Sequence, residues 1–480
     1  MPRTFLLPLL AGSLAFSVSL NSAAQSDVES PPAAQDSGPV EDLDVIMRQL
    51  EEIRGLKFIR DVPARVQPLD DFKAYVERDI DATFPPEIFN NMMDGLMRLG
   101  MVKERFDMGE EFTNALLSQA AAYYDPETGT FFYLMADMPL SALRTVAAHE
   151  LVHALQDQHY DLKTFLSDLE SEVGGDGPRN DDRVLALRAL VEGEATYVQT
   201  LWQMADMNMA MDNNPAMEEM SLKMMANMDI DQLAQMAKQQ MNALDEDDPM
   251  AKAIADMENI PSYILRPLYA AYMNGAYFTM KVRRSGEAWQ ELAATYKDLP
   301  ASSEQVLHPD KYINADRDDP TVLTLPEFEC LAESDWTPID SAIHGEMYLN
   351  LLLREQGDAR RAADAATQGW DGDIYQAWRN DAGDVMIALA TTWDSEADAL
   401  EFLKAWKRIV PRKYAESEVT AFDEDVARNV VWLAYSCGEE QGHGLAVRRG
   451  REVFVVEGAS AELAEKMADE MMRCKIEHKQ

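Results

Sequence analysis

The sequence contains little positive charge. Its 43 Lys and Arg residues stand against 85 Asp and Glu residues, which gives a formal net charge of −42 at pH 7. A chain this acidic repels phosphate backbones and anionic lipid surfaces, whereas it attracts basic peptides. The composition therefore argues against nucleic-acid binding.

Cysteine is also scarce. The three cysteines, Cys330, Cys437 and Cys474, all lie in the last third of the chain. Their spacing matches no zinc motif, and no pattern of His and Asp supports a cysteine nucleophile. In an oxidising compartment they allow one disulfide with one thiol left over, and the sequence does not decide the pairing.

Long apolar runs are missing beyond the N-terminus, where no stretch approaches the roughly 18 residues that span a bilayer. The N-terminus itself has Arg3, an apolar run from Phe5 to Leu20, and the small residues Ser22-Ala23-Ala24. This pattern predicts a signal peptide over residues 1–24 and a flexible linker over 25–40. We therefore expect an exported protein without a membrane span, either periplasmic or secreted.

Apolar periodicity predicts a helix-rich α+β fold. Helical spacing is found over 41–56, 85–99 and 108–120, and aromatic runs on either side of Asp125-Pro-Glu-Thr-Gly129 predict a β-hairpin. Ser141 is expected to cap the next helix. "RVLALRALVEGEATYVQTLW" and "PSYILRPLYAAYMNGAYFTMKV" indicate two further long helices, and Ser302 or Ser303 can cap a short one.

The pattern of apolar and polar residues changes after "NADRDDPT". Strands are expected in "DVMIALATTWD" and "GLAVRRGREVFVVEG", with helices around 343–355, 397–407 and 460–473. We therefore expect one domain over 41–319 and a smaller α+β domain over 320–480. Residues 203–258, rich in Met and Gln, are predicted to form a helical insertion within the first domain.

The stretch "AAHELVHALQDQHYDL", residues 147–162, concentrates histidines. On a helix His149 and His153 share a face, so both rings can bind one metal ion. A catalytic zinc ion needs one more protein ligand and an open position. Glu150 lies beside the metal, where it can take a proton from water and return it to a leaving amine. The motif predicts one catalytic Zn²⁺.

One candidate for the third ligand is His159. Its spacing resembles that of "HExxHxxGxxH" proteases, in which Gly turns the chain back. Here the glycine position holds Gln156. Without glycine the helix is expected to continue, and His159 then faces away from His153.

The other candidates are Glu192 and Glu194 in "LVEGEATY". They lie about 200° apart around a helix, so only one can face the metal. Periodicity does not choose: Glu194 shares an apolar face, whereas Glu192 can pair with Arg188 on the surface. Gly193 costs about 1 kcal/mol relative to Ala inside a helix, and close packing against the histidine helix would explain it.

"HELVH" followed by a helix with "EGEA" resembles the gluzincin metallopeptidases, whose third ligand is the first glutamate of such a stretch. The resemblance implies that Glu192 is the ligand and that Glu194 lies behind it. Many gluzincins orient a histidine with an Asp at the position of Thr196, and Asp157 or Glu194 can substitute. "ALRALVEGEATY", "SSEQVLHPDKY" and, more loosely, "GWDGDIY" resemble secreted bacterial proteins thought to be zinc metallopeptidases.

The resemblance also implies a substrate-binding edge strand ahead of the histidine helix. Residues 131–135, "FFYLM", or their partner strand fit this description, although core-facing aromatics would look the same. A donor to the reacting carbonyl is expected too. His308 is a candidate with Tyr312 nearby, or it is a structural histidine. Tyr272 and Tyr277 are the other candidates.

Two functions remain open at this point. The first is an exported zinc-dependent peptidase that uses His149, His153 and Glu192 as ligands and Glu150 as general base. The second is a non-catalytic exported binding or scaffold protein that keeps a zincin-like fold. In the second case a protein partner would bind through the Met-rich insertion or the C-terminal domain.

Overall fold

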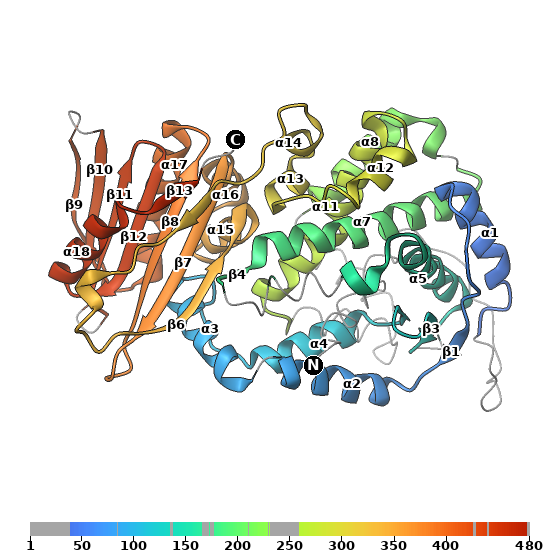
Figure 1. Cartoon of the computed structure of the whole chain (residues 1–480), viewed down its shortest axis with the longest axis horizontal. Helices are drawn as coiled ribbons and strands as arrows, with labels where there is room; N and C mark the ends of the chain where they lie inside the picture. The colour runs from blue at the N-terminus through green and yellow to red at the C-terminus, as the bar shows by residue number, and fades with distance from the viewer. Residues whose placement is uncertain are drawn as a thin grey trace. The chain divides into compact units, whose positions relative to one another are not determined.

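The structure is a computed structural model. It describes residues 39–83, 85–134, 138–165, 172, 177–209, 211–228, 230, 259–425, 429–438 and 441–477. The predicted signal peptide and nearly all of the predicted linker lie outside these residues, as does most of the second half of the predicted insertion. Helices and one large sheet together confirm the α+β class (Figure 1). Among the described helices, none has the length and apolarity needed to span a membrane.

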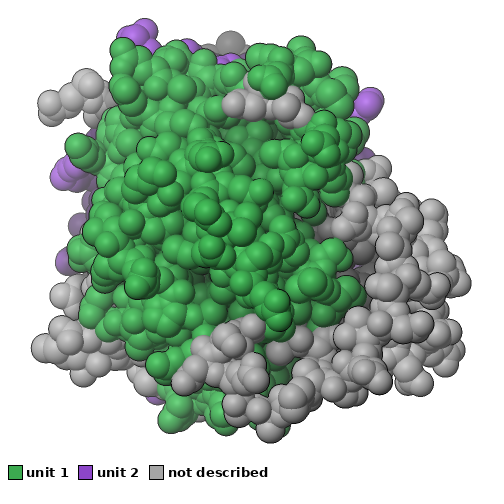
Figure 2. All heavy atoms as spheres, turned by 90° about the vertical axis from the view of Figure 1, so that its right-hand side faces the viewer, with its two compact units in different colours: residues 1–83, 109–171, 187–299 green, residues 84–108, 172–186, 300–480 purple. Residues whose placement is uncertain are grey.

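The chain forms two compact units, and each is assembled from separate stretches of sequence. Unit 1 comprises residues 1–83, 109–171 and 187–299, and unit 2 comprises 84–108, 172–186 and 300–480 (Figure 2). The predicted domain boundary at 319/320 therefore falls inside unit 2. Two stretches within the predicted first domain also belong to unit 2.

Unit 1 is mostly helical. Its helices are α1 (Leu43–Arg54), α2 (Leu69–Thr83), α4 (Met108–Gln119), α5 (Leu140–Tyr160), most of α7 (Asp181–Asp206), the short η3 (Met211–Asn213), α8 (Pro215–Ala226), α11 (Ser262–Ser285) and α12 (Trp289–Thr295). Its three strands, β1 (Ala64–Val66), β2 (Ala122–Asp125) and β3 (Thr130–Tyr133), form a sheet in the order β1-β3-β2. The predicted hairpin is confirmed as the antiparallel pair β2 and β3.

The core of unit 1 joins α1 to the histidine helix α5. Ile46 and Leu50 of α1 are fully buried in one cluster with apolar residues of α5 such as Val146. Gly55, at φ 74°, ends α1 with a left-handed residue, a conformation that glycine adopts without steric cost. The prediction that Ser141 caps α5 is wrong, because the helix begins at Leu140 directly after Pro139.

Unit 2 is built on an eight-stranded sheet in the order β4-β6-β7-β8-β12-β11-β10-β9. The strands are β4 (Arg179–Asn180), β6 (Thr337–Ile343), β7 (Trp370–Arg379), β8 (Val385–Trp393), β9 (Glu418–Asp425), β10 (Val430–Ser436), β11 (His443–Arg449) and β12 (Glu452–Ala459), with β5 (Val322–Thr324) and β13 (Lys475–Glu477) paired separately. Its helices are α3 (Pro86–Leu99), α13 (Ser303–Leu307), α14 (Asp310–Ile313), η4 (Glu329–Leu331), α15 (Gly345–Glu355), α16 (Arg360–Thr367), α17 (Glu396–Lys413) and α18 (Ala461–Met471).

Helices cover both faces of this sheet. Ile374 of β7 belongs to the core cluster that includes Met467 of α18. Tyr375, the next residue, points to the opposite face because strand side chains alternate. There α3 lies close, since a Cβ on its Gly95 would come within 2.0 Å of the Tyr375 hydroxyl oxygen.

Candidate metal centre

The histidine cluster depends on how α7 crosses its neighbours. Glu192 lies on α7, and the next residue, Gly193, touches Gly275 of α11. A Cβ on Gly193 would lie 2.2 Å from the Gly275 carbonyl carbon, so the helices meet only because both residues lack side chains. Gly193 does allow close packing, but the prediction that it packs against the histidine helix is wrong, because its partner is α11.

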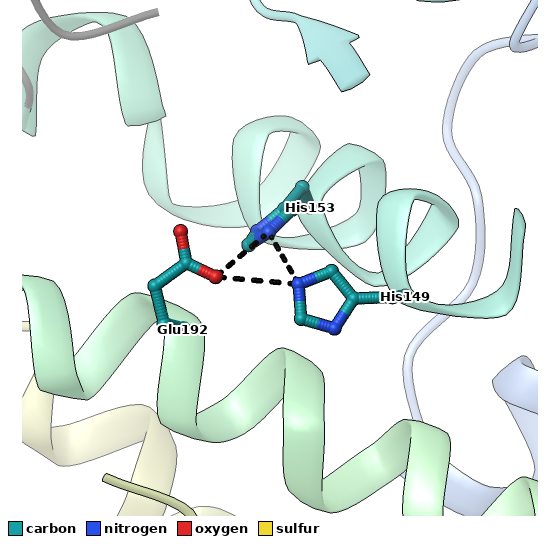
Figure 3. Close-up of side chains that lie close together, drawn as sticks. All are labelled: His149, His153 and Glu192. Carbon is teal, nitrogen blue, oxygen red and sulfur yellow. Dashed lines mark hydrogen bonds and ion pairs between the residues drawn. The ribbon is translucent and has the colours of Figure 1, made fainter. Parts of the chain in front are cut away.

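The side chains of His149, His153 and Glu192 point toward one another from α5 and α7 (Figure 3). The two Nε2 atoms are 3.1 Å apart. The nearer Glu192 oxygen, Oε2, is 3.2 Å from Nε2 of His149 and 3.5 Å from Nε2 of His153. All three residues are buried, with exposures of 1% or less.

Two glutamines hold the outer sides of the histidine rings. Nδ1 of His149 is 3.0 Å from Oε1 of Gln199, and Nδ1 of His153 is 2.7 Å from Oε1 of Gln156. An amide oxygen can only accept, so each Nδ1 carries a proton. Both rings therefore turn Nε2 toward the Glu192 carboxylate. Two ring nitrogens and one carboxylate oxygen converge, and such a group requires a cation, either a proton or a metal ion.

The electrostatics of the cluster agree with this requirement. Burial lowers the pKa of His149. Burial would also lower that of His153, but the Glu192 carboxylate outweighs it and raises the pKa of His153 to about 9. Although burial alone would raise it, the two histidines lower the pKa of Glu192 to about 2. The carboxylate is thus charged, and a metal ion entering the cluster has to displace a proton.

The donor set fits zinc. Ligand atoms bound at about 2.0–2.1 Å to a tetrahedral zinc ion lie about 3.3 Å from one another. The three separations here are 3.1, 3.2 and 3.5 Å. The second carboxylate oxygen, Oε1 of Glu192, is buried without a hydrogen-bond partner among the described residues. Two imidazoles and one carboxylate are also the ligand types of a catalytic zinc site.

Glu150 is fully buried on α5 between the two histidines in sequence. The backbone N–H of Tyr124 in β2 donates to its Oε2 over 3.0 Å. The Tyr124 hydroxyl in turn donates to Asp157 Oδ2 at 2.8 Å, and an Arg60 N–H donates to the same oxygen at 3.0 Å. Asp157 therefore contributes to the support of strand β2, and the hydrogen bonds found for its side chain go to Tyr124 and Arg60 and not to the histidines.

Glu194 lies behind the cluster, as expected. It accepts a hydrogen bond from Gln156 Nε2 at 3.1 Å and so reaches His153 through that amide. The residues that contact the rings directly, Gln156 and Gln199, were not foreseen. Gln199 lies seven residues after Glu192, two helical turns along the same face, and this spacing is the signal that points to it.

His159 does not join the cluster. It lies in the last turn of α5, and its Nε2 is 2.8 Å from the Lys57 carbonyl oxygen. The continued helix turns it away, as the lack of glycine at position 156 predicts. Glu192 is fully buried toward the histidines, so it is not a surface partner of Arg188.

The candidates for a donor to the substrate lie in different units. His308 belongs to unit 2, where its Nε2 is 3.0 Å from Glu346 Oε1, and Tyr312 lies in α14 of the same unit. Tyr272 of α11 lies in unit 1, buried, with its ring centroid 5.9 Å from that of His149. Burial, followed by the charge of Glu192, raises the pKa of Tyr272 well above its usual value, so the hydroxyl keeps its proton.

The strand order decides which part of the hairpin is at an edge. Residues 131–133 of "FFYLM" form most of β3, which lies between β1 and β2. The expectation that this strand is an edge is therefore wrong for Phe131–Tyr133, and Met135 lies outside the described residues. Among the described residues, the partner strand β2 is at the edge of this sheet, with β3 as its neighbour.

A second group of carboxylates, in unit 2, consists of Glu304, Asp318 and Asp394. The ammonium group of Lys311 is bonded to all three, at 2.5, 2.8 and 2.8 Å. The Lys311 ammonium group thus supplies the positive charge for these three carboxylates. Unlike the histidine cluster, this carboxylate group does not need a metal ion to balance its charge.

Comparisons with known proteins bear on unit 2 only. A family described as a domain of unknown function, DUF8575, matches residues 337–468. This stretch contains the greater part of the large sheet and none of the residues of the histidine cluster. No curated protein matches the chain, and no solved structure does.

Proposed function

We propose that this chain is an exported, zinc-dependent peptidase of the gluzincin type. His149, His153 and Glu192 would hold the ion, as their spacing and the orientation of both rings support. The observation that carries the proposal is the convergence of three lone-pair donors in a buried cluster, with both Nδ1 atoms already engaged by amide oxygens. Such an arrangement is costly without a cation.

When bound, zinc supplies a water molecule whose pKa is lowered to about 7 and a Lewis acid for the carbonyl oxygen. Glu150, held by the Tyr124 N–H, would take the proton of the attacking water and deliver it to the leaving amine. Tyr272, which stays protonated, would donate to the carbonyl oxygen as it gains negative charge. The outer edge of β2 would pair with an extended peptide.

The burial of the cluster favours a second candidate. With all three ligands exposed by 1% or less, the site also suits a structural metal in a non-catalytic binding or scaffold protein. The two functions differ in one observable property, because only the peptidase cleaves peptide bonds.

The test is peptide hydrolysis by the zinc-loaded protein and by Glu150→Gln. The variant should retain one zinc ion per chain and lose about 10²- to 10⁴-fold in kcat, since it keeps the shape of residue 150 without its basicity. Glu127→Gln is the matched control, because Glu127 pairs with Lys163 at the surface of the same unit. A Glu150→Gln variant as active as the wild type would refute the mechanism, and a zinc-loaded wild type without activity would favour the second candidate.

A further inference from the structure

Arg54, the last residue of α1, is a buried cation. It is 2% exposed, and its guanidinium group binds Glu194 through Nε and the Tyr160 hydroxyl through Nη2, the latter at 2.9 Å. Its Cζ also lies 4.7 Å from the centre of the Trp289 ring. Burying such a charge is unfavourable unless it is well paired, and replacement of such pairs by apolar residues is often harmless. The arrangement therefore suggests a role beyond stability.

The partner of Arg54 fixes one end of the Gln156 amide. Gln156 Nε2 lies 3.1 Å from Glu194 Oε2 and 2.9 Å from the carbonyl oxygen of Val191. A carboxylate and a carbonyl can only accept, so the NH₂ group must be the end that faces them. The amide oxygen then faces Nδ1 of His153, at 2.7 Å. The Glu194 carboxylate and the Val191 carbonyl together thus determine the direction of the amide.

The direction of the amide decides which nitrogen of His153 is available. With Oε1 toward the ring, Nδ1 holds a proton, so the neutral ring offers the lone pair of Nε2 to the cluster. If the amide turned by 180°, its NH₂ group would need a lone pair on Nδ1. The neutral ring would then carry its proton on Nε2, pointing into the space between His149 and Glu192, where it would block a metal ion.

We propose that Arg54 is a positioning residue for the metal ligand His153 and acts through Glu194 and the amide of Gln156. The inference rests on the proposed metal site. It adds that helix α1, almost a hundred residues ahead of the histidine motif, is part of the machinery that prepares the site. His149 relies on Gln199 for the same purpose and has no described link to Arg54.

The first measurement is zinc affinity, by competition with a chromophoric chelator, on the full chain. Arg54→Met should weaken zinc binding about 10- to 100-fold, the usual effect of losing a residue that orients a ligand. Arg54→Lys, which can still pair with Glu194, should recover most of the affinity. Arg60→Met is the matched control. Like Arg54, Arg60 pairs with a carboxylate, in this case Asp157 of α5, but Arg60 is exposed and does not bind Glu194 or Gln156 in the described structure. The zinc affinity of Arg60→Met should stay within twofold of that of the wild type.

Arg54→Met leaves Glu194 as a buried, uncompensated anion, so it can fail to fold. The double variant Arg54→Met/Glu194→Gln removes both charges and replaces an acceptor-only carboxylate by an amide, which leaves the Val191 carbonyl to hold the NH₂ end of Gln156. It should fold and still bind zinc more weakly than the wild type. If either variant folds and binds zinc as tightly as the wild type, the proposal is overturned.

A second readout separates this proposal from the proposed function. In ¹⁵N-labelled protein without zinc, the Nδ1 proton of His153 should give a hydrogen-bonded ring signal in the wild type and in Arg60→Met. The signal should be lost or strongly shifted in the double variant. An unchanged signal would overturn the relay even if the wild type binds zinc. A wild type that shows the expected signals and binds no zinc would instead refute the proposed function.

Discussion

At the scale of single residues, the sequence predicts the centre of the site better than its surroundings. His149, Glu150 and His153 follow from helical spacing alone, because residues four apart share a face. Glu192 does not, since periodicity left Glu194 equally open and only the resemblance to gluzincins favoured the former. The structure brings Glu192 to the rings.

The residues behind the ligands were harder to predict for a physical reason. Gln199 and Arg54 act across helix–helix contacts, and their local sequence does not record which helix lies opposite, whereas Gln156 contacts His153 within α5. The resemblance implied a carboxylate that orients one histidine, whereas an amide oxygen faces Nδ1 of both rings. A neutral amide fixes the ring as a carboxylate does but adds no negative charge next to the metal.

Tyr272 gives a prediction at this scale. Tyr272→Phe keeps the buried ring beside His149 and removes only the hydroxyl donor. If the hydroxyl stabilises the reacting carbonyl oxygen, kcat should fall about 10²-fold while zinc affinity stays unchanged. Steady-state kinetics on a peptide substrate, with a zinc titration of the same preparation, measure both. Full activity in the variant would remove Tyr272 from the mechanism, whereas lost zinc would assign it a purely structural role.

At the scale of elements, amphipathic helices were the most predictable part of the fold. The helices expected over 41–56, 85–99 and 108–120 are α1, α3 and α4, and those expected in the last third are α15, α17 and α18. The strands in "DVMIALATTWD" and "GLAVRRGREVFVVEG" are confirmed as β8 and the pair β11 and β12. Ser302 caps α13 by accepting from the Gln305 N–H.

Several strands were missed because their sequences do not alternate clearly. In β7, eight of the ten residues are buried. The stretch around "GWDGDIY" therefore lacks the alternation of apolar and polar residues that marks a strand with one solvent-exposed face. Strand β9, "EVTAFDED", is largely exposed and acidic, which is typical of a protected sheet edge and also of a loop. Whether these two stretches form strands depends on their positions in the sheet and not on their local sequence preferences.

The contact between α7 and α11 gives a prediction for elements. In Gly275→Ala the new Cβ would lie 2.3 Å from the Ala189 carbonyl oxygen, so the helices must separate. We expect a loss of about 1–3 kcal/mol in the free energy of unfolding from this overpacking. Zinc affinity should fall as well, because α7 carries Glu192.

Urea unfolding and chelator competition test this expectation. Gly177→Ala is the control, because a Cβ there meets nothing within 4 Å. A Gly275→Ala variant with the stability and zinc affinity of the wild type would show that the close contact between the helices is not needed.

At the scale of the whole molecule, the division into units was the least predictable feature. Residues 84–108 belong to unit 2 through contacts with strands and helices more than 250 residues later. Gln356 Nε2, for example, donates to the Gly100 carbonyl oxygen at 2.7 Å, and Arg379 donates to Asn91 Oδ1 at 2.9 Å. The composition and periodicity of the sequence do not indicate such interleaving.

The stability of the molecule should depend on pH through unit 2. Burial raises the pKa of Asp182 from 3.8 to about 8. The folded state thus holds a proton that the unfolded chain releases above about pH 4. The contribution of this carboxyl group is complete below about pH 4 and is lost as the pH rises to about 8, at up to about 1.4 kcal/mol per pH unit.

Urea unfolding of the wild type and of Asp182→Asn at pH 5 and pH 8 measures this contribution. The wild type should lose more stability between the two pH values than the variant does, because the amide that replaces the carboxyl group cannot ionise. Equal losses in both proteins would show that Asp182 does not hold its proton in the folded state.

The central claim is that two histidines of α5 and Glu192 of α7 bind one zinc ion. The most direct test is the zinc content and affinity of three purified proteins: wild type, Glu192→Ala and His159→Ala. We predict one tightly bound zinc ion in the wild type and in His159→Ala, and a loss of affinity of at least about 100-fold in Glu192→Ala. Zinc lost only from His159→Ala, or not bound by the wild type, would contradict the account.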